Sequence, residues 1–185
     1  MPIDARRWLW IWILLLTAAS VFVTLGMACV TPFAALATLA ALHMSRRDGF
    51  ALIGIAWLAD QAVGYGLVGY PRTANSVAWG VILGVGAFAA LLAAQALVER
   101  LRDRGAVLAG GLAFGGAFVA YQAVLVAATA VLASGSEAFS LPVVAWVLRV
   151  NLLSLGGLLI LHRLAVWIGL VTREPLGARE IVTAG

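Results

Sequence analysis

The sequence predicts an all-α polytopic membrane protein: a bundle of six transmembrane helices with both termini on the cytoplasmic side. Of its 185 residues, 64% are hydrophobic and 11% are charged, whereas a soluble domain averages about 45–50% and about 25%. A soluble fold of this size could not bury so much apolar surface, but lipid can cover it. We expect residues 1–170 to form one transmembrane domain and residues 171–185 a short cytoplasmic tail.

Six apolar segments can be drawn along the chain, and five of them reach the roughly 20 helical residues that span the hydrocarbon. The second, at about 14 residues, would cover only ~21 Å. It is interpreted as a short helix, a re-entrant segment or a helix that borrows from Val30. Pro32 should mark its start, because proline is tolerated in a first helical turn. The segments are Trp8–Val30, Thr31–Met44, Phe50–Tyr70, Ser76–Val98, Ala106–Ala133, and Leu141 to about Leu161.

The arginines test this count. All 12 basic residues are arginine, and they lie mainly between the apolar runs, where they orient a membrane protein and meet lipid headgroups rather than nucleic acid. With the N-terminus inside, every arginine except Arg72 and Arg149 falls in a cytoplasmic segment. Leaving out the short second segment would place Arg46 and Arg47 outside. The positive-inside rule therefore favours six crossings.

Pairs of glycines recur at the spacing that lets helix backbones approach closely in lipid. Gly80 and Gly84 form one pair, and Gly111 and Gly115 form another. Such pairs are typical of helix packing in general and do not by themselves indicate a function.

Two charged residues lie inside apolar segments. Asp60, followed by Gln61, falls near the middle of the third segment, and Arg149, close to Asn151, falls in the sixth. A charge at such depth costs several kcal/mol unless it is paired, protonated or hydrated. Because the two segments run in opposite directions, we expect Asp60 and Arg149 at similar depth, as an ion pair. The pair would either lock two helices together or line a polar cavity that receives a ligand.

The connection between the third and fourth segments combines aromatic and hydrogen-bonding side chains. Such a mixture suits an amphiphilic ligand that enters from outside. It is also what an ordinary interfacial turn with anchoring aromatics would contain. The candidate binding residues here are Tyr65, Tyr70, Arg72, Asn75 and Trp79.

Metal-ligating and catalytic residues are sparse. His43 and His162 lie near cytoplasmic helix ends and could meet at a haem or metal, although two histidines alone are a poor metal signature. Cys29, the single cysteine, could ligate the metal centre of a cofactor, but a lone cysteine is more often a small buried hydrophobe. No zinc-hydrolase, nucleophile-elbow or Walker motif is present. We therefore predict that the protein is not an enzyme.

Three stretches resemble a known family. They are Pro32–Ala37 with Ser45–Arg47, Trp57–Gly66, and Tyr70–Gly80. They resemble the substrate-binding S components of energy-coupling-factor transporters, and within that group the solitary cobalamin-type proteins called BtuM. Overall length and helix number agree with the same family.

The resemblance implies a six-helix protein with a ligand cavity open to the outside, in the bacterial inner (plasma) membrane. Tyr70, Arg72, Asn75 and Trp79 would lie near the mouth of that cavity. Cobalamin would be the transported ligand rather than an intrinsic cofactor, and an ATPase or coupling module could be a partner. BtuM-like proteins are associated with a cysteine that binds the corrin cobalt. The matching stretch around Trp79 contains no cysteine, and this departure from the family pattern counts against cobalamin. The candidate metal ligand of this chain is Cys29, its single cysteine.

The leading hypothesis is thus a substrate-binding membrane protein for uptake of a vitamin-type small molecule, with cobalamin as the ligand that the resemblance indicates. Its partners would be the substrate, the lipid bilayer and a coupling module, and not nucleic acid. The alternative is a non-catalytic assembly factor or structural subunit of a larger membrane complex. A third interpretation is a redox or haem protein that uses His43 and His162.

Overall fold

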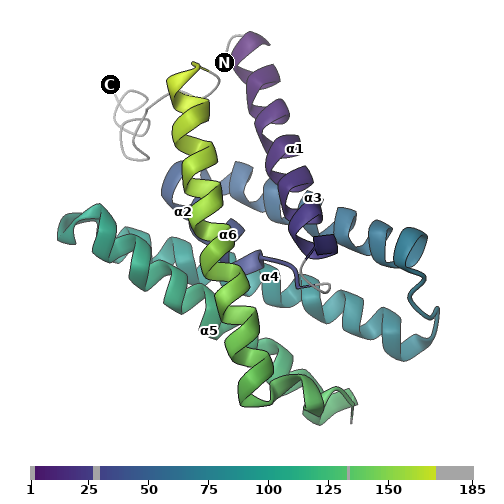
Figure 1. The fold of residues 1–185 in the computed structure, drawn as a ribbon. Coiled ribbons are helices and arrows are strands. Elements are labelled where there is room, and N and C mark those ends of the chain that lie inside the picture. The colour runs from purple at the N-terminus through teal and green to yellow at the C-terminus, as the bar shows by residue number, and fades with distance from the viewer. Residues whose placement is uncertain (1–2, 27–29, 133, 170–185) are drawn as a thin grey trace.

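The computed structural model describes residues 3–26, 30–132 and 134–169, and these form an all-α bundle (Figure 1). Three short turns interrupt or join the helices: a π-helical turn η1 (Gly64–Val68) and the 3₁₀ turns η2 (Arg102–Arg104) and η3 (Ser136–Phe139). The six helices are α1 (Ile3–Gly26), α2 (Phe33–His43), α3 (Arg46–Val63), α4 (Ala74–Arg100), α5 (Ala106–Leu132) and α6 (Leu141–Trp167).

Five of these helices are long and apolar enough to cross a membrane, and α2 is the short exception. Their outward side chains are large and apolar: Phe22 is 79% exposed, Val107 91% and Leu141 82%. Exposure of such an apolar surface to water along whole helices would be unfavourable, whereas lipid tails are as apolar as these side chains. The chain is therefore a multi-pass membrane protein, as the composition predicts.

Local capping explains why two helices begin earlier than the apolar runs do. Ser45 accepts a hydrogen bond from the Asp48 amide at 3.3 Å, so α3 begins at Arg46 rather than near Phe50. Thr73 accepts from the Ser76 amide at 3.2 Å and starts α4 at Ala74. In both cases a side-chain hydroxyl oxygen accepts a hydrogen bond from an amide of the first helical turn, which would otherwise have no partner. At its C-terminal end, α6 continues past the predicted end near Leu161 and reaches Trp167.

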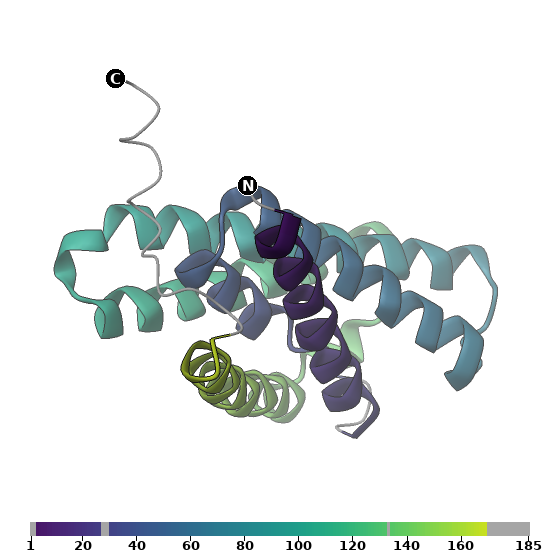
Figure 2. The ribbon, with the colours of Figure 1, turned by 90° about the horizontal axis from the view of Figure 1, so that it is seen from above.

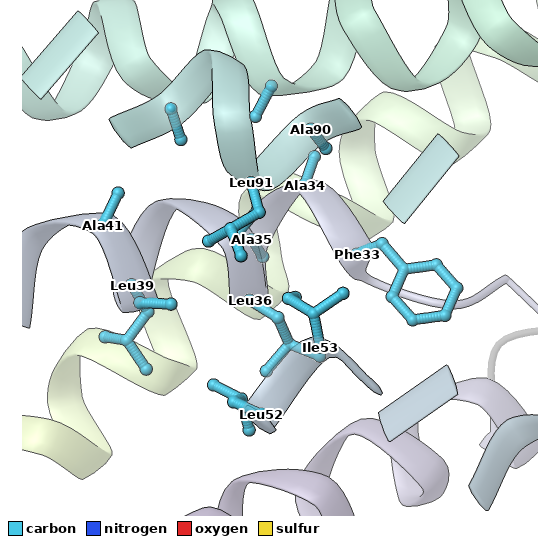
Figure 3. Packing of buried hydrophobic residues seen from close by; sticks show 14 of the residues in the cluster. Phe33, Ala34, Ala35, Leu36, Leu39, Ala41, Leu52, Ile53, Ala90 and Leu91 are labelled. Carbon is cyan, nitrogen blue, oxygen red and sulfur yellow. The ribbon is translucent and has the colours of Figure 1, made fainter. Parts of the chain in front are cut away.

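Helix α2 lies at the centre of the bundle and contacts α3, α4, α5 and α6. From Phe33 to Ala41 every residue is buried, which fits a helix that is apolar on all sides. Five of these residues are alanines, so the neighbouring helices can approach α2 closely. Figure 3 shows its side chains packed against Leu52 and Ile53 of α3 and Ala90 and Leu91 of α4.

The bundle has two ends. The start of α1 and the end of α6 lie together, at the top of Figure 1, and we call this the terminal end. The opposite, loop end holds the α3–α4 and α5–α6 connections. Seen from above in Figure 2, α1 and α6 both lie on one side of the long α4–α5 pair and run steeply across it.

Only one of the two predicted glycine pairs packs against a neighbour. A Cβ atom added to Gly84 would lie 2.8 Å from the Trp57 ring, and one added to Gly80 would collide with the Gln61 side chain. Close packing of α4 on α3 at this pair is confirmed. At Gly111 and Gly115 nothing lies within 4 Å, and both are exposed. Within the described residues, the second pair therefore packs against no neighbouring helix.

Candidate functional site at the start of the short helix

Polar side chains gather where α2 begins. The Thr31 hydroxyl donates to Oδ1 of Asp60 at 2.9 Å, and Nε2 of Gln61 donates to Oδ2 at 3.3 Å. Asp60 is only 9% exposed. Because Thr31 precedes the first residue of α2 by two positions, these bonds fix the Asp60 carboxyl group beside the start of that helix.

The start of α2 is itself capped by another helix. Oδ1 of Asn151 in α6 accepts from the amides of Ala34 at 3.1 Å and Ala35 at 3.4 Å. Its Nδ2 donates to the Val147 carbonyl at 3.0 Å. Pro32, the residue before the helix, makes no side-chain cap. Asn151 thus supplies the acceptor that orphan first-turn amides require inside an apolar bundle.

These contacts place the start of α2 inside the bundle rather than at its surface. Asn151 lies ten residues after the start of α6, about 15 Å along that helix. The 11 residues of α2 cover only about 16 Å and end where His43 stacks on His162. A half-length helix that starts at mid-depth points the positive end of its dipole at the Asp60 region.

The predicted ion pair between Asp60 and Arg149 is wrong. Arg149 is exposed, and no described carboxylate pairs with it. The physical reason is the helical period: Arg149 and Asn151 are two residues apart, about 200° around α6. Since Asn151 faces α2, Arg149 faces away from the core in which Asp60 is buried.

Tyr65 and Tyr70 meet at the loop end. Their rings lie edge to face with centroids 5.9 Å apart, and the Tyr65 hydroxyl lies 3.0 Å from that of Ser76. The π-helical turn η1 brings them together. Its end is closed by a bond from the Tyr70 amide to the Gly64 carbonyl at 2.9 Å and by Gly69 at φ +77°, a conformation that favours glycine. Single π turns are frequent at functional sites.

Asn75 and Trp79 lie at the same end but bond to the protein itself. Trp79 Nε1 donates to the Ser134 hydroxyl at 3.1 Å, and that hydroxyl donates to Oδ1 of Asn75 at 3.2 Å. These bonds tie the start of α4 to the segment after α5. Arg72 is exposed in the connection nearby. The loop-end candidates are therefore close in space, but Nε1 of Trp79 and Oδ1 of Asn75 are already engaged in hydrogen bonds within the protein.

Gln61 lies between the two groups of polar residues. It bonds to Asp60, and its side chain touches the backbone of α4 at Gly80. The neighbouring Trp57 donates from Nε1 to the Gly80 carbonyl at 2.8 Å and fixes α3 against α4. We call Thr31, Asp60, Gln61, Tyr65 and Ser76 the polar cluster. It runs along α3 from the start of α2 towards the loop end.

Sequence reasoning missed three members of this arrangement. Thr31 and Ser76 were not among the candidate binding residues, and Asn151 appeared only as a neighbour of Arg149. A signal for Asn151 did exist, because a short helix that follows a proline needs an acceptor from elsewhere in the chain.

His43 and His162 do meet, at the terminal end. Their rings stack with centroids 4.0 Å apart and 24° between planes, and Trp12 lies 5.8 Å from the His162 ring. Stacked rings do not present their nitrogens to one ion from two sides, as paired axial ligands of a haem do. No group of three or more metal-ligating side chains occurs among the residues that the structure describes. Cys29 lies outside those residues.

Comparison of the chain with models of protein families, with curated proteins and with solved structures gives no match.

Proposed function

We propose that this protein is the substrate-binding membrane component of an uptake system for a vitamin-type small molecule, with cobalamin as its ligand. The observation that supports this most directly is Asp60: a carboxyl group deep in a membrane span, held by uncharged donors. Ionisable groups at such positions are by default functional. Two of its roughly four acceptor sites are occupied, so the carboxyl group can accept further bonds from a ligand.

The surroundings of Asp60 suit an amphiphilic molecule. The polar cluster leads from Asp60 to the paired rings of Tyr65 and Tyr70 at the loop end. Aromatic faces with a few fixed polar groups are typical of small-molecule sites. In the proposed mechanism, ligand enters from the loop end, taken as outside by the arginine distribution, and reaches the start of α2.

The choice of cobalamin rests on the resemblance to BtuM-like S components. Cys29 stands two residues before Thr31 in the sequence, and Thr31 bonds to Asp60. We propose that the Cys29 thiolate ligates the corrin cobalt, since a thiolate is a soft metal ligand. No nucleotide-binding motif is present, so inward release would use reorientation of the protein or a partner ATPase module.

Binding is tested by absorbance. Detergent-purified protein is incubated with cobalamin and desalted, and the wild type should keep corrin bands at a near-stoichiometric level. Cys29→Ala should shift the bands, because the axial ligand is lost. Asp60→Asn should lower retention, whereas Glu99→Gln, which changes an exposed carboxylate at the end of α4, should not. A wild type that retains no corrin contradicts the cobalamin assignment, and other vitamins would then be screened by thermal shift.

One observation favours the alternative of a structural subunit. Gly111 and Gly115 form a small-residue face on α5 that is exposed and meets nothing within 4 Å. Faces of this kind let another helix approach in lipid. The alternative predicts a stoichiometric partner protein that co-purifies in mild detergent and is lost in Gly115→Leu. It also predicts that no vitamin stabilises the purified protein.

A further inference from the structure

A groove separates α1 from α6 on the surface of the bundle. It has a volume of about 580 Å³, with Ala18 and Ala19 on one wall, Leu153 and Gly157 on the other and Pro32 also lining it. Small residues on both walls keep it open. Towards the terminal end α1 and α6 come together where Trp12 meets His162.

The walls of the groove are suited to a hydrocarbon chain. Most of its lining is alanine, glycine, leucine, valine and phenylalanine. The Ser154 hydroxyl, which also lines the groove, donates to the Val150 carbonyl of its own helix at 2.7 Å. A serine satisfied in this way does not require a polar ligand.

Arg149 continues the same face of α6. Arg149, Leu153 and Gly157 follow one another at intervals of four residues, which places them in one row along the helix. Arg149 lies within the span Leu141–Trp167, about 12 Å from its start. It is exposed, and no carboxylate in the described part of the chain pairs with it.

An exposed guanidinium at this depth needs an anion or water. Helical side chains lean towards the N-terminus of their helix, so Arg149 leans towards the membrane surface at which α6 begins. A long side chain in this position reaches the headgroup region while its stem stays in the apolar layer. The anion available at that surface is a lipid phosphate.

We propose that the α1–α6 groove and Arg149 together bind one phospholipid from the leaflet on the loop side. One acyl chain lies in the groove between the small residues of α1 and α6, and the phosphate accepts hydrogen bonds from Arg149. Planar guanidinium groups suit phosphate oxygens because they donate two parallel bonds. This site is separate from the polar cluster and does not depend on the proposed function.

The test is native mass spectrometry of the purified full chain with phosphatidylglycerol or with diacylglycerol of the same acyl chains. The wild type should retain one lipid and should prefer phosphatidylglycerol, because only this lipid carries a phosphate. Arg149→Gln should reduce that preference by about tenfold, as expected for the loss of a charged hydrogen bond. Arg72→Gln, which removes an exposed arginine of the α3–α4 connection, should leave the preference unchanged.

A second pair of variants tests the groove. Gly157→Leu should reduce retention of both lipids because the new side chain narrows the groove, and Ala18→Leu should do the same from the α1 wall. Gly156→Leu is the matched control, since Gly156 also has open space around it but does not line the groove. Equal retention by Arg149→Gln, Gly157→Leu and the wild type would overturn the proposal. So would a dimer of the chain in place of the lipid-bound monomer.

Discussion

Asp60 is fixed by a threonine hydroxyl and a glutamine amide, both of them uncharged groups. This arrangement differs from a buried ion pair in one measurable respect. When a buried carboxylate is paired with an arginine, removal of the arginine strongly destabilises the folded protein. When the carboxyl group is held by neutral donors, removal of an arginine leaves the stability of the protein unchanged, whereas removal of a donor lowers it.

A double-mutant cycle separates the two cases. Asp60→Asn combined with Thr31→Val should be non-additive in the free energy of unfolding, by about 0.5–3 kcal/mol, because the residues share a hydrogen bond. Asp60→Asn combined with Arg149→Gln should be additive within about 0.5 kcal/mol. Reversible unfolding in mixed micelles measures both coupling energies. Strong coupling of Asp60 to Arg149, with none to Thr31, would contradict this account and support the ion pair.

The sequence identified Asp60 and Arg149 as unusual residues, because each interrupts an apolar run. It could not identify their partners. Depth in a span follows from counting residues, but the direction in which a side chain points depends on how each helix is rotated in the bundle. That rotation is set by packing around α2. The aromatic pair Tyr65 and Tyr70 was predictable because both lie in one short connection.

At the scale of the elements, α2 depends on a residue from another helix. Its first amides bond to Asn151, and they would otherwise be unsatisfied inside an apolar bundle. Asn151→Ala should therefore lower the free energy of unfolding by about 1–3 kcal/mol. Ser154→Ala, on the same face of α6, should cost less, because that hydroxyl bonds only within its own helix. Equal costs in thermal unfolding would argue against the cap.

Two glycine substitutions test the packing of α4 on α3. In Gly84→Ala the new methyl group meets the Trp57 ring at 2.8 Å, and the strain should cost about 1–3 kcal/mol. Gly111→Ala introduces a methyl group into open space. It should leave stability unchanged or raise it by about 0.5–1 kcal/mol through the better helix propensity of alanine. Comparison of the two unfolding midpoints decides whether only the first pair packs.

The number and type of the elements followed from the sequence because apolar length is a strong signal in membrane proteins. Helix ends were less accurate, because α3 begins at Arg46, ahead of its apolar run, and α6 continues to Trp167. The mid-depth start of α2 was missed, because the residue that caps it lies more than a hundred positions away along the chain. The Gly80–Gly84 and Gly111–Gly115 pairs have the same spacing, so the sequence did not show that the first pair is buried and the second exposed.

At the scale of the whole molecule, α2 decides the topology. It runs from mid-depth to the terminal end, where His43 stacks on His162, and it is too short to span the hydrocarbon alone. With six passages, the starts of α1 and α3 lie on one side of the membrane and the α3–α4 connection lies on the other. The position of the polar cluster, the proposed entry of ligand from outside and the leaflet of the bound phospholipid all depend on this arrangement.

The most direct measurement is the accessibility of single cysteines to an impermeant thiol reagent in sealed cells, in a Cys29→Ser background. Arg7→Cys and Arg47→Cys, both exposed in the wild type, should be protected until the membrane is opened, and Arg72→Cys should react at once. This result places the starts of α1 and α3 together inside and the α3–α4 connection outside. Labelling of Arg7→Cys and Arg47→Cys from opposite sides would contradict the six-passage topology.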